Sequence, residues 1–365
     1  MWNMEQFRKE LAEIVNLDSS SENLQDIAVI GRMLANRLRD EGYLVETFDE
    51  DTRIEARTHS EKDFDVMFVG HMDTVFPKGT AAERPYREEG NLAYGPGVAD
   101  MKAGLILAIH LAQRLREERP GLRICFAFNS DEEIGSGRSK TWLQGLAKHT
   151  RYAFVFEPGR LNNGFVRSRK GGADLEVSFQ GIAAHAGVAP EKGANALVEM
   201  ARWITELTAL QDFDAGTSIT AGIASGGTAV NVVAEHAQVK LDIRFKNPGE
   251  IERIRETVSR LQQNPVVSGV SAGVVFKDVV MPMNPSEVTE QLMAKMNQAA
   301  ENLGQDICWV DTGGVSDANH IASLGVPTLC GCGPVGNNMH SNAEYMELDS
   351  IEKRLELMYR LIMQL

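Results

Sequence analysis

Three short, almost entirely apolar segments constrain the fold of this chain more than any other feature. They read DVMFVG, LRICFAFN and RYAFVF, and helical apolar spacing recurs around them, as in MKAGLILAIHLAQRLREE. Strands buried on both faces of a parallel sheet have this near-continuous apolar composition, whereas strands with one solvated face alternate. The chain is therefore predicted to be an α/β protein with a mostly parallel sheet.

A different pattern occupies residues 171–279. Here ADLEVSFQ, TSITAGIAS, EHAQVKLDIRF and VSAGVVFKD resemble strands with one buried face, and two helical segments lie among them. The order strand, helix, strand, strand, helix, strand is that of a ferredoxin-like domain. Because 365 residues exceed what one core usually serves, we expect two domains. Residues 1–170 and 280–365 would form the first, and residues 171–279 an inserted α+β domain.

Charge and cysteine usage restrict the partners of the chain. A formal net charge of -14 argues against nucleic acid and against anionic membrane surfaces, since both would repel it. The longest apolar candidate, GLILAIHLA, is too short to span a bilayer. The four cysteines form no C-x-x-C pair and suggest reduced thiols. We therefore expect a cytoplasmic protein with neither a nucleic-acid nor a membrane partner.

Acids and imidazoles follow the predicted strands and the glycine-rich turns. In open α/β sheets, ligands bind beyond the carboxyl ends of parallel strands, so these side chains are expected to converge. Imidazole and carboxylate without thiolate suit zinc, cobalt or manganese, and five ligands with one spare acid would serve metal-assisted hydrolysis. The set is His71, Asp73, Asp100, Glu132, Glu133, Glu157 and His340.

Each of these positions also has a simpler explanation. His71 and Asp73 form an H-x-D pair, which is common in loops. Asp100 precedes a predicted helix, where an ordinary N-cap would account for an acid. His340 lies among polar residues, as an exposed loop histidine would. The three acids at 131–133 are harder to explain this way, because they repel one another unless cations neutralise them.

Six motifs containing these residues resemble one family in order and approximate spacing along the whole chain: GHMDTV, GPGVADMKAG, NSDEEIGS, FEPG, GIAAHAG and MHSNAEY. The family is that of the di-zinc metallopeptidases, which includes acetylornithine deacetylase, succinyl-diaminopimelate desuccinylase, aminoacylase and bacterial glutamate carboxypeptidase. The glutamate carboxypeptidase branch is most similar, through SFQGIAAHAGVAPEKGANALVE and TGGVSDAN.

The resemblance implies two zinc ions per chain, with cobalt or manganese as substitutes. His71 and Glu157 would hold one ion, Glu133 and His340 the other, and Asp100 would bridge them.

The same resemblance implies that Asp73 braces His71. Glu132 would be the general base that takes a proton from the metal-bridging water and passes it to the leaving nitrogen. The peptide bond between Asp100 and Met101 would be cis.

In the inserted domain the resemblance implies a lid and a homodimer contact. His185 would reach the partner subunit's active site and stabilise the oxyanion, and Asn231 and Arg244 would bind the substrate carboxylate. Val315 stands where glutamate-releasing relatives have a third glycine, and Lys277 lies where they have an arginine. Glutamate preference is therefore left open.

We therefore predict a hydrolase, a carboxypeptidase-like protease that cleaves the amide bond of an N-acyl or N-aminoacyl amino acid through a metal-bridged hydroxide. An aminoacylase or a deacetylase of a biosynthetic N-acyl amino acid is the alternative. A non-catalytic metal-binding homologue would lack a ligand or the base, whereas every matched position is filled. A nucleotide-dependent oxidoreductase is disfavoured because no G-x-G-x-x-G follows the first strand.

Overall fold

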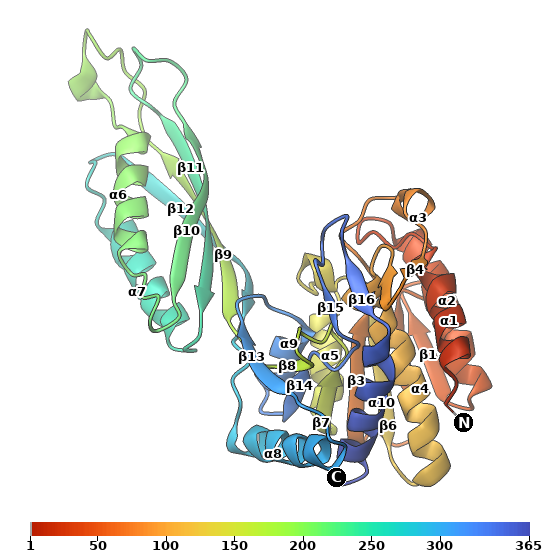
Figure 1. Cartoon of the computed structure of the whole chain (residues 1–365). Helices are drawn as coiled ribbons and strands as arrows, with labels where there is room; N and C mark the ends of the chain where they lie inside the picture. Colours follow the sequence, from red (N-terminus) through yellow and green to blue (C-terminus); the bar gives the residue numbers. More distant parts are fainter. Residues whose placement is uncertain (1) are drawn as a thin grey trace. The chain divides into compact units, whose positions relative to one another are not determined.

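An eight-stranded sheet forms the centre of the first of two units into which the chain divides (Figure 1). The structure is a computed structural model, and it describes residues 2–365. In spatial order the strands are β1 (Leu44–Phe48), β2 (Arg53–Arg57), β6 (Ile124–Asn129), β3 (Phe64–His71), β7 (Thr150–Val155), β14 (Thr328–Cys330), β8 (Gly164–Arg169) and β13 (Cys308–Thr312). The central strands β6, β3, β7 and β14 are parallel, and antiparallel pairs flank them.

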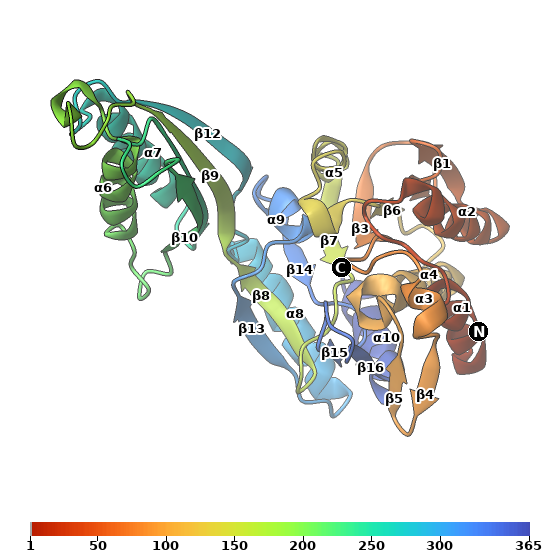
Figure 2. The ribbon, with the colours of Figure 1, turned by 90° about the horizontal axis from the view of Figure 1, so that it is seen from above.

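Helices cover both faces of this sheet, with α5 and α9 opposite α4 and α10 (Figure 2). Along β6, Phe126 and Phe128 belong to one apolar core while Cys125 and Ala127 belong to the other. Burial on both faces explains the near-continuous apolar runs. The helices are α1 (Met4–Val15), α2 (Leu24–Asp40), α3 (Thr80–Glu83), α4 (Ala103–Glu118), α5 (Lys140–Ala147), α8 (Glu287–Asn302), α9 (Asp317–Ala322) and α10 (Asp349–Ile362).

A second, small sheet in this unit joins distant parts of the chain. Its order is β15 (Gly336–Asn337), β16 (Tyr345–Glu347), β5 (Leu92–Tyr94) and β4 (Arg87–Glu89). It places the segment around residue 340 beside the irregular helical turn η1 (Val98–Lys102).

An ion-pair cluster ties together α1, α2 and α4. The Oε2 atom of Glu10 lies 2.8 Å from His110 Nε2, and its Oε1 atom lies 3.0 Å from Arg37 Nε. Burial opposes ionisation of Glu10, but hydrogen bonds with His110 and Gln6, together with the charges of His110 and Arg37, lower its pKa to about 2.

The second unit contains residues 169–282 and Gly313–Val315. Its antiparallel sheet has the order β10 (Ser218–Gly226), β11 (His236–Phe245), β9 (Gly171–Gln180) and β12 (Ser271–Val280). The helices α6 (Ala196–Thr208) and α7 (Glu250–Gln263) cover one face of it (Figure 1). Side chains along β11 alternate between buried and solvent-facing, as the sequence pattern indicated.

These observations confirm the predicted fold class, an α/β unit with a mostly parallel sheet and an α+β unit of ferredoxin-like strand order. The contacts divide the chain after Ser168 and after Pro282, compared with the predicted boundaries at 171 and 279. They also assign Gly313–Val315 to the second unit, where Arg169 Nη1 donates to the Gly314 carbonyl oxygen at 3.0 Å. Among residues 2–365, no helix has the length and apolar composition needed to cross a bilayer.

Candidate metal centre

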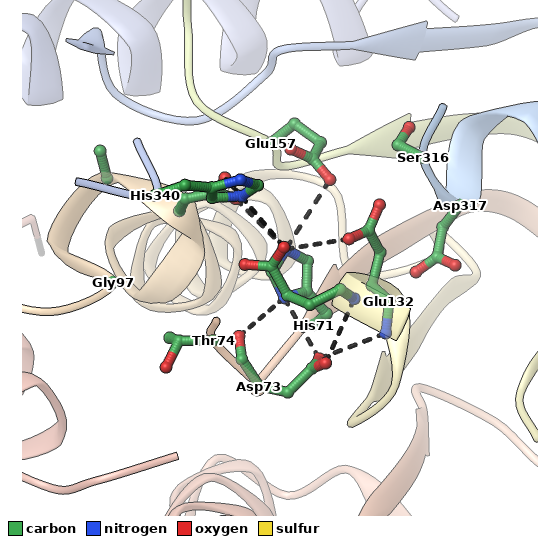
Figure 3. A network of polar contacts seen from close by, with 12 residues as sticks. His71, Asp73, Thr74, Gly97, Glu132, Glu157, Ser316, Asp317 and His340 are labelled. Carbon is green, nitrogen blue, oxygen red and sulfur yellow. Dashed lines mark hydrogen bonds and ion pairs between the residues drawn. The ribbon is translucent and has the colours of Figure 1, made fainter. Parts of the chain in front are cut away.

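The candidate site lies at the carboxyl ends of the central parallel strands of the first unit (Figure 3). His71 is the last residue of β3, Glu132 and Glu133 begin the short turn η2 (Glu132–Ile134) after β6, and Glu157 follows β7. Because parallel strands end at one edge of their sheet, the residues that follow these three strands converge there. The sequence pattern predicted this convergence.

Asp100 lies between the two imidazoles of the site. Its Oδ1 atom is 3.3 Å from His71 Nε2, and its Oδ2 atom is 3.4 Å from His340 Nε2. Glu157 Oε1 lies 3.8 Å from His71 Nε2, and Glu133 Oε2 lies 3.0 Å from His340 Nε2. Each imidazole therefore has its own glutamate, and one aspartate contacts both imidazoles.

The donor set fits divalent cations. It contains four carboxylates and two imidazoles, namely Asp100, Glu132, Glu133, Glu157, His71 and His340. Burial and the nearby Glu157 raise the pKa of Glu132 well above its ordinary value, and burial raises the pKa of Glu133. Hydrogen bonds with Asp100 and Glu133 raise the pKa of His340 to about 10. Crowded carboxylates of this kind are stabilised by bound cations. Two overlapping groups that share His71 have spacing able to hold a metal ion: His71, Glu132 and Glu157, and His71, Asp100 and Glu133.

Asp73 connects the two sides of the site. Its backbone oxygen lies 3.0 Å from His71 Nδ1, which leaves the Nε2 atom of that ring facing Asp100. Its carboxylate accepts hydrogen bonds from the backbone N–H groups of Glu132, at 3.3 Å, and Glu133, at 3.2 Å. One buried aspartate thus orients both the ring and the acidic turn, as partners of metal ligands commonly do.

Three further buried residues support the site, and the sequence motifs had not singled them out. Ser21 Oγ donates to Asp73 Oδ2 at 2.7 Å. Asp317 accepts hydrogen bonds from Asn129 Nδ2, at 2.5 Å, and Ser136 Oγ, at 2.6 Å, and so binds both ends of the segment that contains Glu132. Burial raises the pKa of Asp317 to about 6.

The third of these residues is Glu344, which is 2% exposed. Its carboxylate accepts hydrogen bonds from the backbone N–H groups of Gly97, Ala99 and Asp100. The peptide bond from Asp100 to Met101 is cis, as the family resemblance implied. Glu344 lies within the motif MHSNAEY, so the motif marked the region but not this contact.

The remaining predicted site residues belong to the second unit, where they form two separate pairs. His185 and Asn231 are exposed neighbours: the backbone N–H of Ala186 donates to the Asn231 carbonyl oxygen at 2.9 Å. Arg244 and Val315 lie near each other at Gly172, where an added Cβ would be 3.0 Å from Arg244 Nη1 and 3.5 Å from Val315 Cγ1.

The two pairs lie toward opposite ends of one sheet. Arg244 pairs with Gly172 in the ladder, whereas His236 pairs with Gln180, and the pairing of His185 with Val232 lies beyond that end. Eight strand residues at about 3.3 Å each separate His236 from Arg244 by roughly 26 Å. The two pairs of one chain cannot therefore contact the same small carboxylate.

Arg244 already has one carboxylate partner. Asp242 accepts hydrogen bonds from Arg244 Nε at 3.0 Å and from Nη2 at 2.6 Å. These two hydrogen bonds occupy the Nε–Nη2 edge of the guanidinium. In the same unit, Lys277 Nζ pairs with Glu176 at 3.0 Å.

A family model and individual known proteins match most of this chain. The model of peptidase family M20/M25/M40 matches residues 67–364. Carboxypeptidase G2 of Pseudomonas sp. (strain RS-16) is 30% identical over 98% of this chain and 88% of its own. Succinyl-diaminopimelate desuccinylase of Paraburkholderia xenovorans (strain LB400) is 26% identical over 81% of this chain and 82% of its own.

Solved structures share the fold. Aminopeptidase PepT of Bacillus cereus ATCC 10987 has a TM-score of 0.78 at 23% identity, covering 99% of this chain and 98% of its own. The dinuclear metal-binding peptidase YXEP of Bacillus subtilis has a TM-score of 0.74 at 14% identity, covering 98% of this chain and 97% of its own.

Proposed function

Because the chain belongs to peptidase family M20/M25/M40, as its motifs predicted, we propose that it hydrolyses the amide bond between an N-acyl or N-aminoacyl group and an amino acid with a free carboxylate. The predicted class, a metal-dependent hydrolase, is confirmed by the family match. The carboxypeptidase-like hypothesis is preferred over the deacylase hypothesis because carboxypeptidase G2 is the more similar of the two relatives and aligns with more of this chain.

One observation carries the proposal: Asp100 lies between His71 and His340 with one oxygen toward each. We assign one ion to His71 and Glu157, the other to Glu133 and His340, and the bridging position to Asp100. Zinc is the proposed metal, with cobalt or manganese as substitutes, because the donors are imidazole and carboxylate. When bound, two such ions would polarise the substrate carbonyl and lower the pKa of the attacking water.

Glu132 is the proposed general base. Its Oε2 atom lies 4.0 Å from His71 Nε2, and burial together with Glu157 raises its pKa, so the side chain suits holding a proton between two steps. It takes a proton from the attacking water as the water oxygen joins the carbonyl carbon. It then gives that proton to the nitrogen as the C–N bond breaks, releasing a carboxylic acid and an amine.

We further propose that the active enzyme is a homodimer formed through the second unit. If Arg244 binds the substrate carboxylate with Val315 beside it, then His185 and Asn231 of the same unit lie too far away to contribute to that site. They would serve the site of the partner subunit, where the imidazole of His185 stabilises the oxyanion.

The edge strand β10 supports the proposed dimer. Its outer edge has no strand partner among the described residues, and Ile223 on it is 62% exposed. Mixing inactive Glu132→Gln chains with inactive His185→Ala chains would restore activity in heterodimers, where one site keeps both residues. No recovery despite demonstrated subunit exchange would refute the trans role of His185.

We also propose a cytoplasmic location. Cys125 and Cys332 are buried free thiols, as is typical of proteins in a reducing compartment.

A substrate screen tests the hydrolase proposal. The zinc-loaded chain should cleave peptides and N-acyl amino acids with a free terminal carboxylate, and the same compounds with an amidated carboxylate should be poor substrates. Glu132→Gln is the matched control, because it should bind both ions and leave every compound intact. Equal cleavage of free and amidated substrates would replace the carboxypeptidase assignment with a broader amidase.

A further inference from the structure

Glu344 makes three hydrogen bonds to a single loop. Its Oε1 atom accepts from the backbone N–H groups of Ala99, at 2.9 Å, and Asp100, at 3.0 Å, and its Oε2 atom accepts from that of Gly97, at 3.1 Å. With both oxygens engaged and 2% exposure, the side chain is not itself one of the proposed metal ligands.

The backbone N–H groups of this loop need an acceptor from elsewhere in the chain. They belong to the N-terminal end of η1, where N–H groups have no partner within a helix, and the backbone at Asp100 (φ -112°, ψ 96°) and Met101 (φ -129°, ψ 39°) is not helical. Gly97 has φ +71°, and an added Cβ would lie 2.6 Å from Thr74 Cγ2. Buried N–H groups without an acceptor are destabilising, so the carboxylate stabilises this conformation.

The same contact joins two segments that each supply a proposed ligand. Asp100 is in the loop that donates, and His340 is in the segment that carries Glu344 and ends in β16. The carboxylate of Glu344 accepts directly from the backbone N–H of Asp100, and the side chain of Asp100 contacts the imidazoles of His71 and His340.

We propose that Glu344 is a positioning residue of the metal centre, which holds Asp100 in the bridging position and keeps the segment of His340 beside it. This inference rests on the proposed metal-dependent function. The competing explanation is that Glu344 only stabilises the fold, as any buried cap would.

Metal affinity distinguishes the two explanations. Zn²⁺ and Co²⁺ dissociation constants of the full chain are measured by competition with a chromophoric chelator, at a temperature where the apo-protein is folded. Glu344→Gln puts an amide N–H₂ among N–H donors and should weaken binding by about 10- to 100-fold, as loss of an outer partner of a metal ligand does. The visible spectrum of the Co²⁺ form should change as well. The matched control is Glu347→Gln in β16, three residues further along the same segment, and the affinity of this variant should be unchanged.

A Glu344→Gln chain that is less thermostable but binds both ions like the wild type overturns the inference. Glu344 would then only stabilise the fold. If that variant does not fold, Glu344→Asp replaces it: this variant keeps the charge but reaches less far, and wild-type affinity in it is equally decisive against the inference. A wild-type chain that binds neither ion overturns the proposed function and this inference together. Tight wild-type binding that survives in the variants overturns only the role of Glu344.

Discussion

Replacement of Gly104 by alanine should destabilise the first unit, although alanine is the better helix former. An added Cβ on Gly104, in α4, would lie 2.0 Å from the carbonyl oxygen of Phe156 and 3.1 Å from its Cβ. The helix and the end of β7 would have to separate by more than about 1 Å to relieve this overlap, and the obstacle is backbone rather than a flexible side chain. Helix propensity favours alanine by at most about 1 kcal/mol, whereas overpacking usually costs about 1–3 kcal/mol and occasionally more. We expect a net loss of roughly 2 kcal/mol.

Gly145 provides the matched control. It lies within α5, and an added Cβ there has no atom within 4 Å, so Gly145→Ala should be stabilising by up to about 1 kcal/mol. Urea unfolding of the metal-free variants, followed by circular dichroism, measures both changes, which should have opposite signs.

Metal affinity gives a second readout for Gly104→Ala, because Glu157 directly follows Phe156 and should move with it. A Gly104→Ala chain as stable as Gly145→Ala, with wild-type zinc affinity, would refute the reasoning.

Three further predictions follow from individual side chains. Glu132→Gln should lower kcat by about 10²- to 10⁴-fold and retain two ions, whereas Glu133→Gln should lose metal as well as activity. Elemental analysis measures the bound metal, and equal metal loss in the two variants would contradict the assignment. Arg244→Lys should lower kcat/KM for free-carboxylate substrates about tenfold, equivalent to about 1.4 kcal/mol, and should hardly change the poor cleavage of amidated ones. Glu10→Gln should be destabilising near neutral pH. A pKa of about 2 in the folded state, below the ordinary 4.5, gives stability that is present above about pH 4.5 and is lost as the pH falls toward 2. The free energies of unfolding of the variant and the wild type, measured with denaturant across this pH range, should converge at low pH. A difference that stays constant with pH would contradict this prediction.

The central strands were predictable because burial on both faces requires an almost entirely apolar local sequence. Other elements have less distinctive sequences. The strand β4 reads REE and has no buried residue, so only its pairing with β5 makes it a strand. The strand β13 reads CWVDT and is half-buried, and α9 is a short helix beside two glycines. Composition alone does not distinguish such segments from loops.

The proposed metal ligands could be selected because each lies in a motif after a strand or turn. Their supporting residues could not, because those roles depend on contacts with distant segments. Glu344 is useful only through three N–H groups that lie far earlier in the chain, and nothing near it in sequence indicates them. Ser21 likewise supports Asp73, although one helix and three strands separate the two residues in the sequence. By contrast, the pairing of Arg244 with Asp242 follows from their spacing, since alternate residues of a strand face the same side.

Residues of the proposed metal centre come from the ends of β3, β6 and β7, from η1 and from the segment between β15 and β16, so most of the chain lies between His71 and His340. During synthesis, the acids near the first strands emerge long before the second imidazole exists. The complete ligand set can form only after the last strands have joined the sheet, because β14 lies beside β7 and is among the final elements made. Full metal loading should therefore be a late event in maturation, and the occupied site should report that the sheet has been completed.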